Sequence, residues 1–154
     1  MEWFVLVFGI SLIQDCVRFP TTMGPLLLLH HGACLAGLAV ARIAPGPENW
    51  VRLFPFFFCA CTALEVGSGF CNVYWLRLLR PRQRSLLYLL SMTISNLVAV
   101  ACSSLWASSP LAPGLARAFS LVATCVLVYL RQKEAWSLCG VSRKHWLGKA
   151  GPED

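Results

Sequence analysis

The stretch Leu26–Gly37, LLLLHHGACLAG, places two adjacent histidines inside a run of leucines and small residues. An ionisable side chain within a membrane costs on the order of 3 kcal/mol, so it faces other helices or a cavity. The small residues after the histidines allow neighbouring backbones to approach closely. We therefore expect this stretch to form a helix inside a membrane bundle, with His30 and His31 marking a site.

The composition of the whole chain supports a membrane location. Of the 154 residues, 57% are hydrophobic and 13% are charged, whereas soluble domains are about 45–50% apolar and about 25% charged. A membrane helix needs about 20 apolar residues, so the length accommodates about five such helices and no separate soluble domain. The predicted fold class is all-α, a polytopic membrane bundle of about five transmembrane helices.

The apolar runs and their breaks locate these helices. Pro25 suits the first turn of a helix, and the prolines and glycine of 44–49 predict a break. The expected spans are 1–16, 25–43, 50–80, 85–106 and 115–130. This pattern divides the chain into a transmembrane domain, 1–131, and a basic tail, 132–154, that we expect to be cytosolic and disordered.

The distribution of basic residues predicts the orientation. Five alternating spans place ten of the thirteen lysines and arginines, including the tail residues Arg131 and Lys133, on one side. Cytoplasmic loops carry an excess of such residues, so the N-terminus is expected outside or in the lumen and the C-terminus in the cytosol. Trp50, Trp75 and Trp106 lie near span ends, as interfacial aromatic residues do.

Several classes of function are disfavoured by the same composition. The net charge of +6 comes from residues at the ends of apolar runs, and nucleic-acid binding needs a solvated basic face. The eight cysteines lie mostly in apolar runs, where cysteine behaves as a small hydrophobe. Cys59 and Cys61 have no zinc-site spacing, and adjacent histidines on a helix point about 100° apart. We expect no metal and no cofactor.

Five polar residues fall in the cytosolic half of the expected bundle: Asp15, His30, His31, Glu65 and Asn72. Glu65 and Asn72 are seven residues apart and share a helix face if the helix is regular. A histidine beside a carboxylate can act as a general base or can orient an acyl substrate. Alternatively, these groups join helices through hydrogen bonds of about 1 kcal/mol each. One site shared by all five is geometrically possible.

The chain resembles the TLC domain, named for its translocating-chain, longevity-assurance and ceroid-lipofuscinosis members. The matching features within about residues 9–130 are Asp15, the Leu29-His30-His31 segment, and the stretch from Glu65 to Leu76, EVGSGFCNVYWL. Gly69 stands where small members of the family tend to have proline, and Tyr74 where arginine is common. Full TLC domains have further spans before the aspartate, so the resemblance implies an N-terminally truncated or divergent member.

The ceramide synthase branch of this family can be compared residue by residue. Counting from His30, the family's Leu-Glu pair coincides with Leu64-Glu65. Its His-Asp and second Asp positions fall on Phe57, Phe58 and Cys61. Phenylalanine cannot transfer a proton, so we favour a protein that is not an enzyme.

The resemblance implies lipid handling: binding, sensing or regulating phospholipid or sphingolipid in the endoplasmic reticulum, with the plasma membrane as the alternative. The lipid site that it implies is formed by Asp15, His30, His31, Glu65 and Asn72. One alternative is an N-acyltransferase of the ceramide synthase kind that uses Asp15, His30, His31 and Glu65. Another is a membrane cargo receptor or scaffold that binds protein partners through the cytosolic tail.

Overall fold

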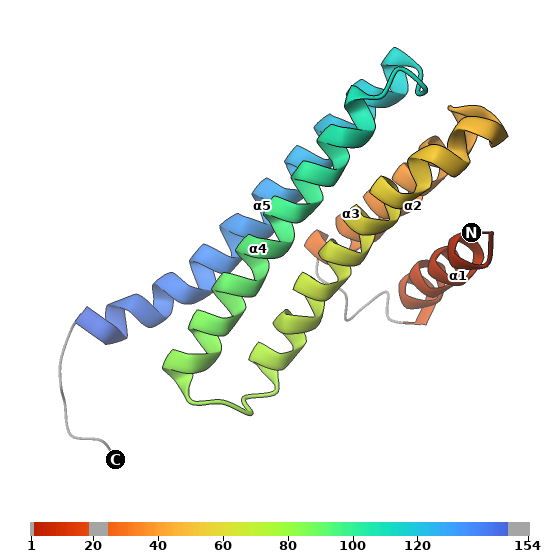
Figure 1. Ribbon diagram of the computed structural model, residues 1–154. Coiled ribbons are helices and arrows are strands. Elements are labelled where there is room, and N and C mark those ends of the chain that lie inside the picture. Colours follow the sequence, from red (N-terminus) through yellow and green to blue (C-terminus); the bar gives the residue numbers. More distant parts are fainter. Residues whose placement is uncertain (1, 19–24, 148–154) are drawn as a thin grey trace.

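A computed structural model shows five α-helices in residues 2–18 and 25–147, which are the residues that the structure describes (Figure 1). This part of the chain contains no strand, so the predicted all-α class is confirmed. The helices are α1 (Glu2–Arg18), α2 (Pro25–Ile43), α3 (Gly46–Trp75), α4 (Pro81–Ser108) and α5 (Gly114–Leu147).

Three of these helices are long and apolar enough to cross a membrane: α3, α4 and the Gly114–Gly140 part of α5. At about 1.5 Å per residue, the 34 residues of α5 extend about 51 Å, more than the hydrocarbon core of about 30 Å. Within α1 and α2, the apolar stretches found among the described residues, Trp3–Gln14 and Leu28–Ile43, are shorter. The chain is an integral membrane protein, and five crossings remain a prediction.

The bundle is built around α3 and α4, which form an antiparallel hairpin with the most extensive helix contact, and α5 packs along α4 (Figure 1). Helix α2 contacts both α3 and α5. Helix α1 packs on α2, and Phe4 adds an edge-to-face contact with Phe58 of α3 at 4.6 Å between ring centroids. The position of α2 between α3 and α5 determines which side chains its histidines meet.

The connection between α2 and α3 is shorter than the sequence predicts. Only Ala44 and Pro45 separate α2 from α3. The predicted break at 44–49 is therefore wrong for 46–49, which form the start of α3. Gly46 has a φ of +77°, a left-handed conformation that glycine adopts without a steric cost. The side-chain amide of Asn49 donates to the carbonyl of Pro45 at 3.1 Å and ties the first turn of α3 to the connection.

The C-terminal boundary also differs from the prediction. Helix α5 continues past residue 131 to Leu147, so residues 132–147 are helical rather than disordered, and 148–154 lie outside the described residues. The reason is packing: Ala135 is completely buried against Tyr88 and Met92 of α4. Apolar residues resume after Glu134, and α4 is long enough to cover them.

Two of the three tryptophans expected at the membrane interface are core residues. Trp50 and Trp106 are each 2% exposed and pack with Leu53 and Ala116 at one end of the bundle. Of these three tryptophans, Trp75 alone is exposed. Helix α3 begins before Trp50 and helix α4 ends after Trp106. These two side chains therefore pack between helices although they lie near the ends of the apolar runs.

Candidate functional site

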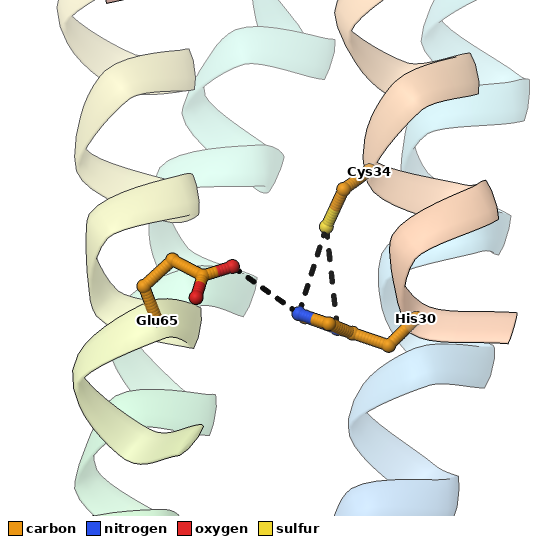
Figure 2. A group of neighbouring side chains, drawn as sticks. All are labelled: His30, Cys34 and Glu65. Atoms are coloured by element: carbon orange, nitrogen blue, oxygen red, sulfur yellow. Dashed lines mark hydrogen bonds and ion pairs between the residues drawn. The ribbon is translucent and has the colours of Figure 1, made fainter. Parts of the chain in front are cut away.

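The expected partnership between His30 and Glu65 is present in the structure. Helix α2 places the His30 ring toward α3, and its Nε2–H donates to Glu65 Oε1 across 3.3 Å (Figure 2). The side chain of His30 is 4% exposed, whereas that of Glu65 is 41% exposed. The pair therefore joins two helices and leaves part of the carboxylate accessible from outside the bundle.

Cys34 completes a cluster with this pair. It lies one turn after His30 on α2, and its Sγ is 3.8 Å from His30 Nε2 and 4.0 Å from Nδ1 (Figure 2). Side chains four residues apart share one helix face, so the local helix explains why both point toward Glu65. Imidazole, thiol and carboxylate thus meet at one point between α2 and α3.

The other predicted site residues contribute less directly. His31 is buried, and its ring centre lies 5.6 Å from that of His30. Asn72 is exposed, and no hydrogen bond in residues 2–18 and 25–147 joins its side chain to His30 or Glu65. Asp15 belongs to α1, and its side chain lies outside the described part of the chain. One shared cluster of all five residues is therefore not observed.

Arg131 is the largest departure from the sequence interpretation, which assigned it to the basic tail. It is 5% exposed and lies within the bundle. Its NH1 donates to Ser68 Oγ at 2.8 Å, its NH2 to the Leu64 carbonyl at 2.8 Å, and its Nε to Asn96 Oδ1 at 3.3 Å. Buried charges need such partners, and here one guanidinium joins α5 to both α3 and α4.

The hydrogen-bond network continues from Arg131 along the facing sides of α4 and α5. Asn96 donates to Gln132 Oε1 at 2.9 Å, and Gln132 donates to Thr93 Oγ1 at 3.1 Å. Removing Arg131 from the tail leaves nine of twelve basic residues on the predicted cytosolic side, so the charge asymmetry persists. Asn96 and Thr93 of α4 are therefore joined to α5 by side-chain hydrogen bonds.

Gly67 allows α3 to approach this network. A Cβ at this position would overlap the Ser95 hydroxyl and would lie 2.6 Å from an Arg131 NH2 nitrogen. Helices in membranes use small residues for such close approaches. Because Gly67 lies two residues after Glu65, the same contact fixes the part of α3 that carries Glu65 against α4 and α5.

Two hollows adjoin the cluster. A groove of about 410 Å³ lies between α2 and α5. Its lining residues are apolar or glycine: Leu28, Leu29, Gly32, Ala33, Phe119, Ala123, Val126 and Leu127. A smaller cavity of about 60 Å³ is lined by Cys34 and Cys61 and shares Ala33 and Leu127 with the groove. The polar cluster and the groove are therefore neighbours.

Phe57, Phe58 and Cys61, which the sequence-based comparison set against acid–base positions of ceramide synthases, have packing roles in this structure. Phe57 packs against the core around Trp50, and Phe58 contacts α1 through Phe4. Cys61 is buried and lines the small cavity. Phe57 and Phe58 thus stabilise the bundle, and their side chains have no group that can transfer a proton.

Sequence reasoning missed Cys34 and Arg131 as residues of the interior. The spacing of His30 and Cys34, four residues on one helix, was a usable signal for the first. For Arg131, the signal was the return of apolar residues in 135–141, AWSLCGV, which indicates that the helix continues.

No protein-family model, curated protein or solved structure matches the chain.

Proposed function

We propose that this membrane protein binds a lipid between α2 and α5 and takes part in regulating phospholipid or sphingolipid composition. The observation that carries the proposal is the apolar groove of about 410 Å³, which shares Ala33 and Leu127 with the small cavity that Cys34 of the cluster lines. Ligand sites are typically about 300–1,000 Å³, mostly apolar, with a few polar groups that orient the ligand. The resemblance to TLC domains, which stays a prediction, implies the same class of function.

The proposed occupant of the groove is an acyl chain. Leu28, Leu29 and Val126 offer it only apolar surface, and Gly32 leaves room because nothing lies within 4 Å of a Cβ built there. The headgroup would lie toward the cluster by way of the small cavity, which Cys34 lines and which shares Ala33 and Leu127 with the groove. The exposed part of the Glu65 carboxylate accepts hydrogen bonds from hydroxyl or amine groups, which sphingolipids and several phospholipids carry.

Photocrosslinking tests this proposal with a matched pair of variants. Gly32→Leu fills the groove, whereas Gly69→Leu adds the same side chain at an exposed glycine of α3 outside it, and neither glycine has an atom within 4 Å of its Cβ. In cells fed a photoactivatable sphingosine or fatty acid, Gly32→Leu is expected to lose most of the crosslinked lipid and Gly69→Leu to retain it. Equal crosslinking of both variants at the wild-type level would contradict the assigned groove.

The regulatory part of the proposal needs a cellular measurement. Lipid analysis of cells lacking the protein is expected to show a changed acyl composition that wild type restores and Gly32→Leu does not. An unchanged composition would remove the regulatory role and favour the scaffold alternative.

An N-acyltransferase is the second candidate, because His30 and Glu65 form the histidine–carboxylate pair that general-base catalysis uses. Purified protein incubated with a sphingoid base and a labelled acyl-CoA would then form labelled amide. His30→Gln should abolish this product, and the absence of product from wild type removes the candidate.

A further inference from the structure

The cluster between α2 and α3 contains three side chains of metal-ligating type. One ligand atom of each of His30, Cys34 and Glu65 lies within 4.8 Å of the other two. His30 and Cys34 are buried, and the carboxylate of Glu65 points to the His30 ring from the opposite helix (Figure 2). Lipid binding does not require the Cys34 thiol, so this cluster has a separate explanation.

Two of the three spacings between the ligand atoms are close to those of a tetrahedral zinc site, and the third, between a Glu65 oxygen and Cys34 Sγ, is within 4.8 Å where such a site has about 3.6 Å. A tetrahedral zinc with bonds of about 2.0–2.1 Å to nitrogen or oxygen and about 2.3 Å to sulfur separates N from O by about 3.4 Å and N from S by about 3.6 Å. The corresponding distances are 3.3 Å from His30 Nε2 to Glu65 Oε1 and 3.8 Å from His30 Nε2 to Cys34 Sγ. The two shared edges therefore match within a few tenths of an ångström.

We propose that His30 Nε2, Cys34 Sγ and a Glu65 carboxylate oxygen bind a zinc ion between α2 and α3. The donor set favours zinc over calcium or magnesium, which prefer oxygen ligands. Three protein ligands leave a fourth tetrahedral position, the arrangement of zinc sites that bind water or substrate. This inference does not depend on lipid binding, and it replaces the sequence-based expectation of no metal.

The charge of the complex suits its surroundings. Zinc binds the cysteine as thiolate, with release of the thiol proton, and the glutamate as carboxylate. The two negative ligands and the divalent cation sum to zero, so the complex adds no net charge to the bundle. Burying an uncompensated charge there would be costly.

Cys61 provides a neighbouring thiol on the other helix. It precedes Glu65 by four residues on α3, as His30 precedes Cys34 on α2, and residues at this spacing share a helix face. Cys61 and Cys34 line the same cavity of about 60 Å³, which has room for a water beside these two thiols. The fourth ligand is therefore assigned to a water on the Cys34 side of the cluster.

Metal content and cobalt spectroscopy test the site directly. The full-length protein, purified in detergent and exposed to Zn²⁺, is expected to retain one zinc per chain after removal of free metal. Substitution with Co²⁺ should produce a thiolate-to-cobalt charge-transfer band and the visible bands of tetrahedral cobalt. A wild-type protein that retains no zinc and shows no such band would overturn the proposal, leaving an interhelical hydrogen bond in its place.

Variants separate the site from adventitious binding. Cys34→Ser should abolish the charge-transfer band and weaken zinc binding by about 100-fold or more, and Glu65→Gln should weaken it while retaining the band. Cys125→Ser, at an exposed cysteine of α5, is the matched control and should behave as wild type. Cys61→Ser should keep the band. Equal zinc content in Cys34→Ser and Cys125→Ser would contradict the site, and circular dichroism verifies that each variant is folded.

Discussion

Gly67→Ala offers the sharpest test of the packing that holds Glu65 in place. The new methyl group would overlap the Ser95 hydroxyl and lie 3.0 Å from Ser95 Cβ, so rotation of the serine alone cannot make room. Overpacking of this kind costs about 1–3 kcal/mol. The methyl group also displaces the Arg131 NH2 group, which donates a hydrogen bond to the Leu64 carbonyl. Hydrogen bonds between membrane helices contribute about 0.6 kcal/mol on average.

The intrinsic helix preference acts in the opposite direction, since alanine stabilises a helix by about 0.5–1 kcal/mol relative to glycine. The sum is a net destabilisation of about 2 kcal/mol. Gly69→Ala is the control, because nothing lies within 4 Å of a Cβ at this position. Only the favourable helix preference of alanine over glycine then remains. Reversible unfolding in mixed detergent micelles, followed by circular dichroism, should place the two variants on opposite sides of wild type. A Gly67→Ala protein as stable as Gly69→Ala would refute the close approach of α3 to Arg131.

Three further predictions concern the network and the topology. Asn96→Leu removes an acceptor of Arg131 and a donor to Gln132, so we expect a loss of about 1–2 kcal/mol in the same unfolding assay; no loss would show that these bonds add nothing. Ser103 and Thr124 are joined by a hydrogen bond of 3.0 Å, and a double-mutant cycle with Ser103→Ala and Thr124→Val should give a coupling of about 0.6 kcal/mol. Additive effects would contradict that bond. An epitope appended after Asp154 should be accessible once the plasma membrane alone is permeabilised, and its protection would reverse the predicted orientation.

The sequence alone predicted the five helices and placed His30 and Glu65 among five polar site residues, although it misplaced ends of α3, α4 and α5. The apolar runs predicted five helices, and the cost of an ionisable group in a membrane singled out His30 and Glu65. Both predictions rest on local properties of the chain, hydrophobic length and the chemistry of single side chains. The same local properties explain why α2 was predicted with its correct bounds.

Only the tertiary structure decided which groups meet. Cys34 looked like a small hydrophobe until the register of α2 against α3 brought its thiol to the histidine and the carboxylate. Arg131 looked like a membrane anchor because it ends an apolar run, yet the packing of Ala135 on α4 extends the helix and carries the guanidinium inside. Helical period determines the face on which a side chain lies, but the neighbour that this face meets depends on close contacts between distant segments, such as the one at Gly67.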